Sequence, residues 1–265
     1  MNSLLTRIFS GVIFIILFIS AILYSKESYL ILITLFGFLS LFEFSKMINL
    51  KNIIPYLLLA FLSYAAYTKN EEKLIWIILA VTIICGIRLI IYLYSDKKTY
   101  PKHNFEKLDL SIRYIVFSFF FLQLIPFSEG KYNPNIVIGV LILIWVNDSF
   151  AYLIGKNFGK TKLFERISPR KTIEGFIGGL VFSMISTLLL SKYLNTNLTL
   201  FNWLILAALV SILGTLGDLI ESKFKRQANI KDSGAIMPGH GGILDRLDSL
   251  LFVAPFVYLY LHYLI

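Results

Sequence analysis

Acidic residues stand in two closely spaced pairs near the end of the chain. Asp218 and Glu221 form one pair and Asp245 and Asp248 the other, each with the i, i+3 spacing that places two side chains on one helix face. Carboxylates this close at the edge of an apolar span favour a divalent cation. Between the pairs we expect a loop of lysines, arginine and glycines that brings cations and backbone N–H groups to phosphate oxygens. This combination is typical of metal-assisted phosphoryl chemistry, and salt-bridged charges at a membrane edge are the alternative.

A second polar segment interrupts an apolar run around Asn147, Asp148 and Ser149. A charge inside such a run is costly unless it is paired, hydrated or bound to a metal. Asp148 and Tyr152 are one helical turn apart and can share a face. The segment therefore indicates either a functional site or a hydrogen-bonded pair between helices.

A third segment begins at Ser168 and Pro169, which predict an N-cap and a first-turn proline. Arg170 and Lys171 would then lie at the N-terminus of that helix, where backbone N–H groups gather, and this outlines an anion site. The alternative is an ordinary capped helix, with the glycines at 178 and 179 serving close packing.

The composition shows what must position these residues. Of the 265 residues, 57% are hydrophobic and 15% charged, and the mean hydropathy of +0.75 excludes a soluble globule. The single cysteine, Cys85, excludes an internal disulfide framework and a multi-cysteine zinc site. We predict an all-α, polytopic integral membrane protein with about nine transmembrane helices and its active site at the cytoplasmic edge. The helices are expected at residues 5–24, 29–48, 53–68, 74–94, 110–127, 135–155, 173–191, 200–221 and 246–264.

The basic residues indicate the orientation of these spans. With the N-terminus inside, 20 of the 25 Lys and Arg residues fall in inner segments and 5 in outer ones, as the positive-inside rule requires. The rule therefore places the N-terminus in the cytoplasm, the C-terminus outside and the protein in the cytoplasmic membrane. The net charge of +9 then faces anionic lipid head groups and nucleotides, and we expect no nucleic-acid partner.

The two halves of the chain differ in polarity. We predict that residues 1–131 form structural transmembrane helices and that residues 132–265 form the catalytic transmembrane region with its cytoplasmic loops. In the first half only Glu43 stands out, and we interpret it as a carboxylate that snorkels or pairs with Lys46.

The motifs resemble those of the CDP-diacylglycerol synthase (phosphatidate cytidylyltransferase) family. Two upstream motifs match Asn147-Asp148-x-x-Ala151-Tyr152-x-x-Gly155 and Ser168-Pro169-x-Lys171-Thr172-x-Glu174-Gly175. The longest match is Ser222-x-x-Lys225-Arg226-x4-Lys231-Asp232-x-Gly234-x3-Pro238-x-His240-Gly241-Gly242-x2-Asp245-Arg246-x-Asp248. The resemblance covers about residues 144–249, and Met237 is its one small departure.

The resemblance implies transfer of a cytidylyl group from CTP to phosphatidate, with Mg²⁺ and room for a second cation. It assigns Asp218, Asp245 and Asp248 as metal ligands, with Asp148 and Glu221 as further ligands or supporting groups. Lys225 and Arg246 count with these aspartates as catalytic residues. The substrate-binding set is Asn147, Asp148, Tyr152, Ser168, Lys171, Arg226, Lys231, His240, Gly241 and Gly242, with Lys171 and Ser168 on the lipid phosphate. The bilayer is a further partner, and a homodimer is within expectation.

Two other functions fit part of the pattern. A transferase that uses CTP on a polyisoprenoid alcohol would keep the metal carboxylates but not the full glycine-rich string. A cation-coupled transporter would place acids such as Asp148 and Asp218 near the bilayer midplane. The carboxylates at 218–248 are instead expected at the cytoplasmic edge, where CTP is available.

Overall fold

The computed structural model describes residues 3–68, 72–96, 99–128 and 131–265. Lys69, Lys97 and Lys98, which enter the charge count, lie outside these ranges. The described helices are α1 (Ser3–Tyr24), α2 (Lys26–Met47), α3 (Ile54–Thr68), α4 (Glu72–Tyr94), α5 (Asn104–Leu110), α6 (Phe117–Leu124), α7 (Pro134–Phe158), α8 (Ile173–Tyr193), α9 (Leu200–Gln227) and α10 (Leu244–Leu259). There are also two π-helical segments. The first, η1 (Ser111–Val116), connects α5 to α6, and the second, η2 (Tyr260–Leu264), extends α10. The strands form two short antiparallel hairpins: β1 (Phe127–Ser128) with β2 (Lys131–Tyr132), and β3 (Lys162–Phe164) with β4 (Ser168–Thr172).

The apolar runs of the sequence become helices, as predicted. Within the described residues, each of the nine expected ranges coincides with a helix or a continuous helical segment. Six helices of this part are long and apolar enough to cross a membrane: Lys26–Met47, Lys73–Tyr94, Pro134–Phe158, Ile173–Tyr193, Leu200–Gln227 and Leu244–Leu264. Ile8–Tyr24 and Ile54–Thr68 are shorter apolar helices. The chain is therefore an all-helical integral membrane protein.

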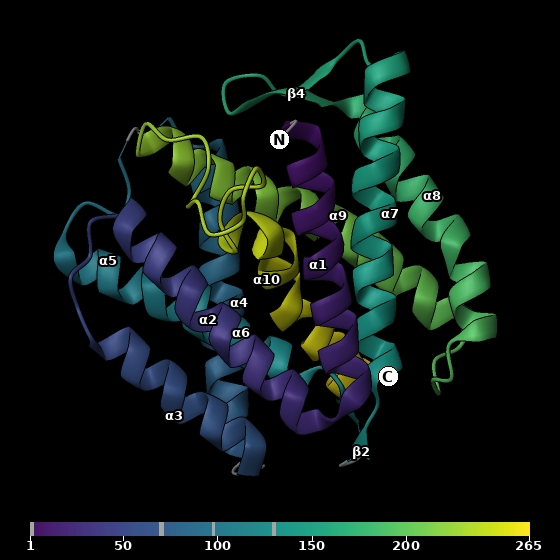
Figure 1. Ribbon diagram of the computed structural model, residues 1–265, viewed down its shortest axis with the longest axis horizontal. Coiled ribbons are helices and arrows are strands. Elements are labelled where there is room, and N and C mark those ends of the chain that lie inside the picture. The colour runs from purple at the N-terminus through teal and green to yellow at the C-terminus, as the bar shows by residue number, and fades with distance from the viewer. Residues whose placement is uncertain (1–2, 69–71, 97–98, 129–130) are drawn as a thin grey trace.

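The helices pack into one bundle (Figure 1). α7 lies along α8, and α9 packs against both α8 and α10. The β3–β4 hairpin covers the upper end of α7 and α8 in Figure 1, close to the start of α1, and the C-terminus lies at the opposite end of the bundle from the N-terminus.

Two glycines explain the close approach of α8 to α7. A Cβ on Gly178 would overlap the side chain of Ile154, and one on Gly179 would lie 2.7 Å from the backbone oxygen of Asn147. The expectation that these glycines serve close packing is confirmed. The contact fixes the part of α7 that carries Asn147 and Asp148.

An aromatic cluster ties the end of α9 to the N-terminal half. The ring of Phe224 on α9 lies 5.6 Å from the rings of both Phe44 on α2 and Tyr92 on α4. Lys223 is also buried, and its Nζ donates to the carbonyl oxygens of Tyr92, in the last turn of α4, and Ser95, just after it, at 2.5 and 2.9 Å. These contacts stabilise α9 as a helix to Gln227, six residues past the expected end at 221.

Candidate active site

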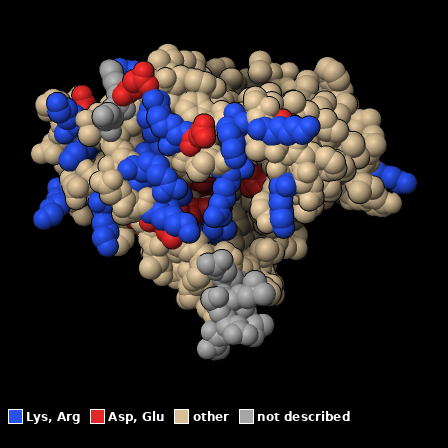
Figure 2. All heavy atoms as spheres, turned by 90° about the horizontal axis from the view of Figure 1, so that it is seen from above, with Lys and Arg blue, Asp and Glu red and all other residues tan. Residues whose placement is uncertain are grey.

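One large cavity opens at the end of the bundle where the β3–β4 hairpin lies. Its volume is about 860 Å³, within the range of sites that hold cofactor-sized ligands. Figure 2 views this end and shows Lys and Arg side chains gathered around a hollow in which acidic side chains are visible. Ten expected site residues line the cavity: Asn147, Asp148, Tyr152, Ser168, Lys171, Asp218, Lys225, Asp245, Arg246 and Asp248. Arg170, expected beside Lys171 at an anion site, also lines the cavity, together with polar residues that had no predicted role, among them Lys156, Lys162, Thr215 and Ser249.

Helix α7 forms one wall of the cavity. Asp148 and Tyr152 both line it, which confirms that the two share a helix face. The amide of Asn147 donates from Nδ2 to Oδ1 of Asp148 at 3.3 Å. The carboxylate is therefore turned toward the cavity by its own helix rather than paired with another span.

The segment at Ser168 is a strand, so the predicted N-cap at that residue is wrong. A residue before proline disfavours the helical region, and Ser168–Thr172 pairs instead with Lys162–Phe164. The helix begins at Ile173, and its N-cap is Thr172, whose Oγ1 accepts from the backbone N–H of Gly175 at 3.1 Å. Lys171 thus lies on β4, directly before the helix, and its Nζ is 2.5 Å from Oδ2 of Asp218.

Contacts at both ends hold the hairpin over the cavity. The backbone N–H groups of Lys160 and Thr161 donate to the carboxylate of Glu174 on α8. At the tip, Arg166 pairs with Asp96 after α4, and the guanidinium holds the pKa of that carboxyl below its usual range. The hairpin is therefore fixed to α8 and to the segment that follows α4.

Helix α9 carries the first acidic pair, but the two acids have different surroundings. Asp218 lines the cavity, where it accepts from the Ser222 hydroxyl at 3.1 Å. Glu221 is fully buried and forms an ion pair with Lys225 one turn later. The basic residues Lys223, Lys225 and Arg226 were expected in a loop, and this expectation is wrong because α9 continues through them.

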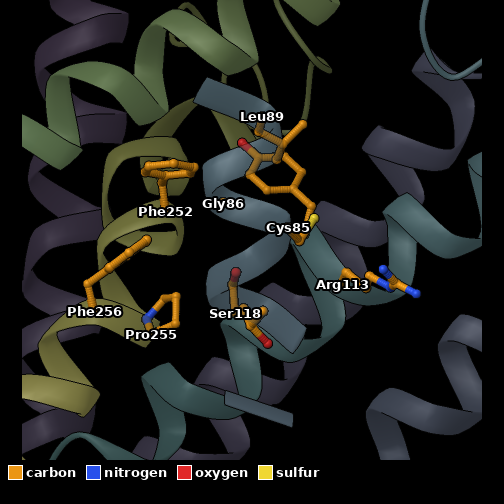
Figure 3. A pocket seen from close by; sticks show the side chains of 10 residues that line it. Cys85, Gly86, Leu89, Arg113, Ser118, Phe252, Pro255 and Phe256 are labelled. Carbon is orange, nitrogen blue, oxygen red and sulfur yellow. The ribbon is translucent and has the colours of Figure 1, made fainter. Parts of the chain in front are cut away.

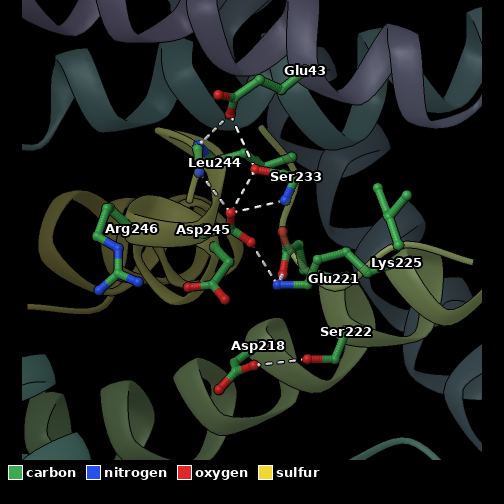
Figure 4. A network of polar contacts seen from close by, with 12 residues as sticks. Glu43, Asp218, Glu221, Ser222, Lys225, Ser233, Leu244, Asp245 and Arg246 are labelled. Atoms are coloured by element: carbon green, nitrogen blue, oxygen red, sulfur yellow. Dashed lines mark hydrogen bonds and ion pairs between the residues drawn. The ribbon is translucent and has the colours of Figure 1, made fainter. Parts of the chain in front are cut away.

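Lys225 joins the two acidic pairs. Its Nζ lies 2.6 Å from Oδ1 of Asp245 while it also contacts Glu221 (Figure 4). Oδ2 of Asp245 accepts from the backbone N–H groups of Ser233 and Gly242, at 2.8 and 2.7 Å. Asp245 is therefore engaged on both oxygens and organises the loop between α9 and α10.

Asp248 is less engaged than Asp245. Its Oδ1 accepts from the backbone N–H of Ser249 at 2.6 Å, and it faces the negative charges of Asp218 and Asp148. Within the part of the chain that the structure describes, neither Asp148 nor Asp248 has an ion-pair partner. Asp148 and Asp248 are thus acidic groups of the cavity lining that have no cation within ion-pair distance among the described residues.

These carboxylates suit a hard cation whose remaining coordination positions are filled by a bound ligand. Among the described residues, no three His, Cys, Asp or Glu side chains converge closely enough to hold a metal ion by themselves. Mg²⁺ commonly uses only one or two carboxylates, with waters and substrate phosphates filling its other positions. The unpaired oxygens of Asp148, Asp248 and, after exchange of its lysine, Asp218 suit that arrangement.

Several expected site residues do not line the cavity. Oδ2 of Asp245 would lie close to a Cβ on Gly241, whose φ is +90°, a backbone conformation that suits glycine. The ring of His240 contacts α1, with Nδ1 2.7 Å from the hydroxyl oxygen of Ser10. The residues outside the lining are Glu221, Arg226, Lys231, His240, Gly241 and Gly242.

The prediction for Glu43 is wrong. The residue neither snorkels nor pairs with Lys46: it is 2% exposed and accepts hydrogen bonds from the start of α10 and from Ser233. No local signal could have revealed this, since its partners lie about 200 residues further along the chain.

A second, much smaller void lies between α4, α10 and η1 (Figure 3). Its volume is about 10 Å³, room for about one water molecule, and aromatic rings of Phe252 and Phe256 form part of its wall. Cys85, a buried free thiol, lines it. The void is too small for a substrate.

Comparison with known proteins finds a family and several relatives that are similar to this chain. The model of the cytidylyltransferase family matches residues 5–264. A phosphatidate cytidylyltransferase of Bacillus subtilis is 35% identical over 259 residues, which cover 95% of each chain. Proteins of the same name from Staphylococcus saprophyticus and Staphylococcus aureus are 43% identical over 159 residues, covering 58% of this chain and 60% of theirs.

Proposed function

The chain belongs to the cytidylyltransferase family, and on that premise we propose that it transfers the cytidylyl group of CTP to phosphatidate in the cavity between α7, α8, α9 and α10. It is a nucleotidyltransferase whose products are CDP-diacylglycerol and pyrophosphate. One observation supports this location for the reaction. Three carboxylates, Asp148, Asp218 and Asp248, line the same cavity as Lys171 and Arg246.

The reaction needs charge neutralisation more than proton removal. A phosphate oxygen of phosphatidate attacks the α-phosphorus of CTP, and the bond from that phosphorus to the bridging oxygen breaks as pyrophosphate leaves with the electron pair. A phosphomonoester has a second pKa of about 6, so the nucleophile is already largely ionised near neutral pH. Positioning and electrostatic stabilisation are then the main catalytic contributions.

The basic residues of the cavity supply part of that stabilisation. Lys171 on β4, with Ser168, holds the lipid phosphate, and Lys225 and Arg246 hold phosphate groups of CTP. Asn147 and Tyr152 on α7 complete the substrate-binding wall. Binding at Lys171 requires its ion pair with Asp218 to open, which frees the carboxylate. Arg226, Lys231, His240, Gly241 and Gly242 remain predicted phosphate contacts from outside the present lining.

Asp148, Asp218 and Asp248 are the residues that would hold Mg²⁺, and a second cation remains a prediction. When bound, the ion would neutralise charge on the phosphate oxygens as they approach one another. Glu221 and Asp245 remain predicted ligands, and either would first have to leave Lys225.

We also propose that the cavity opens to the cytoplasm, with nine crossings, the N-terminus inside and the C-terminus outside in the cytoplasmic membrane. The basic rim of the cavity and the termini at opposite ends of the bundle support this orientation (Figures 1 and 2). Six helices meet the length for a crossing, and α1, α3 and the continuous α5–η1–α6 segment would supply the other three. A homodimer remains a prediction.

An acceptor comparison tests the proposed function. The detergent-purified protein is incubated with CTP and either phosphatidate or a polyisoprenoid alcohol, each with and without Mg²⁺. We expect CDP-diacylglycerol from phosphatidate only when Mg²⁺ is present. A cytidylylated product from the alcohol alone would instead favour the related polyisoprenoid transferase.

A further inference from the structure

Glu43 on α2 is a buried carboxylate at the centre of the loop between α9 and α10. Its Oε1 accepts from the backbone N–H of Ile243 at 3.1 Å, and its Oε2 accepts from that of Leu244 at 2.9 Å. The Ser233 hydroxyl oxygen lies 3.1 Å from the same Oε2 and 2.9 Å from Oδ2 of Asp245. Since a hydroxyl has one proton, Ser233 donates to one of these two carboxylates at a time and links them (Figure 4).

These contacts replace a cap that α10 lacks in its own sequence. The residue at the N-cap position is Ile243, which has no side-chain acceptor, so the first N–H groups of the helix need partners from elsewhere. Glu43 satisfies those of Ile243 and Leu244, and Asp245 satisfies that of Gly242. A negative charge at this end also suits the helix dipole.

Two glycines of the loop leave room for the same carboxylate. A Cβ on Gly234 or on Gly242 would overlap an oxygen of Glu43, and for Gly234 the three nearest atoms all belong to Glu43. Neither glycine has a positive φ. Their small size is therefore required by packing against Glu43 and not by backbone conformation.

We infer that Glu43 is a positioning residue for the reaction: by capping α10 and linking to Ser233, it holds Asp245 against Lys225 and Asp248 toward the cavity. This inference rests on the proposed function. The carboxylate is required because it accepts at both oxygens, whereas a glutamine would turn its NH₂ group toward at least one N–H donor. The residue acts through the loop and does not itself line the cavity.

The first test compares Glu43→Gln with Gln123→Leu, a control that removes another buried polar side chain bonded to α2, at Thr34, away from the loop. Amide hydrogen exchange of residues 231–247 and thermal unfolding are measured for both, together with kcat and the Mg²⁺ concentration for half-maximal rate. For Glu43→Gln we expect faster exchange in that segment, kcat lower by about 10- to 100-fold and a higher Mg²⁺ requirement. We expect Gln123→Leu to lower thermal stability without these changes.

A double-mutant cycle with Gly234→Ala tests the route of the effect. Its new Cβ displaces the Glu43 carboxylate, so Gly234→Ala and Glu43→Gln should reduce kcat through the same disturbance, and the double variant should be little worse than either single one. Glu43→Asp, which keeps the charge on a shorter side chain, provides a second variant if the glutamine does not fold, and it should retain more activity than Glu43→Ala.

The outcomes separate this inference from the proposed function. Three results would each overturn the role of Glu43. Amide exchange of residues 231–247 could be unchanged in Glu43→Gln, or it could change equally in Gln123→Leu. Alternatively, the reductions in kcat caused by Glu43→Gln and Gly234→Ala could multiply in the double variant. Lack of cytidylyl transfer by the unmodified protein would overturn the proposed function, while the exchange measurement would still decide whether Glu43 caps α10.

Discussion

The Nζ of Lys171 lies 2.5 Å from Oδ2 of Asp218, so a cation on β4 neutralises a carboxylate on α9 inside the cavity. The two side chains are 28% and 33% exposed, and ligands can reach both. An arriving lipid phosphate can replace the carboxylate on Lys171 while a cation replaces the lysine on Asp218. The ion pair thus couples the proposed phosphate site to the proposed metal site.

Substitution of Lys171 should affect one substrate more than the other. Lys171→Ala removes a charge-assisted hydrogen bond worth roughly 1.5 to 3 kcal/mol, which predicts about 10- to 100-fold weaker phosphatidate binding with little change in the CTP dependence. KM values for both substrates measure this, with Lys160→Ala, an exposed lysine before the same hairpin, as the control. If binding of CTP and of phosphatidate weakened equally, Lys171 would be reassigned to the nucleotide or to a position between the two reacting phosphates.

Loss of a carboxylate should remove turnover without unfolding the protein. Asp248→Asn and Asp218→Asn should each nearly abolish cytidylyl transfer, because a neutral amide is a much weaker Mg²⁺ ligand. Turnover and the recovery of monodisperse protein from detergent are measured beside Asp109→Asn, which removes an acid that pairs with Arg113 on the next helical turn. Unaltered turnover in either site variant would take that residue out of the catalytic set.

Lys225 should contribute to stability as well as to catalysis. Lys225→Met leaves Glu221 and Asp245, with side chains 0% and 5% exposed, without their cation, and removal of one partner from a buried pair costs about 3 to 5 kcal/mol. Adding Glu221→Gln should recover part of the thermal stability but not the activity if Lys225 also holds a phosphate. Recovery of both in the double variant would show that Lys225 is only structural.

The proposed orientation can be measured with reporters at the two ends. A C-terminal fusion should be active only with a reporter that works outside the cell, and an N-terminal fusion only with one that works inside. Both termini on one side would mean an even number of crossings and would contradict the assignment of nine.

The sequence predicted most of the helices because long apolar runs leave few alternatives in a membrane. It also predicted that Asp148, Asp218 and Asp248 meet, because the motif resemblance assigned all three to one site, and they line one cavity. The β3–β4 hairpin was not predicted because it consists of two short strands that contain several charged residues, and the Ser-Pro sequence at the start of β4 resembles a helix N-terminus. The end of α9 was misplaced because Lys223 and Phe224 continue the helix through contacts with α2 and α4, which local sequence does not show.

Glu43 illustrates a different limit. A single acid among apolar residues has an ordinary explanation at a helix end, and its real partners, the N–H groups of Ile243 and Leu244, carry no side-chain signal. Gly234 and Gly242 are the sequence features that relate to this contact, because the Glu43 carboxylate packs where a side chain on either residue would lie. Without the fold, these two glycines could not be connected with a residue on α2.

The most direct test of the proposed cytidylyl transfer follows labelled phosphorus from CTP into lipid. The purified protein is given phosphatidate, Mg²⁺ and CTP labelled with ³²P at either the α or the γ position, and the Asp248→Asn variant is run in parallel. We expect the α label to enter the lipid, the γ label to be released as pyrophosphate, and both to depend on Asp248. Lipid labelled from the γ position, or no lipid labelled from the α position by the active, folded protein, would contradict this expectation.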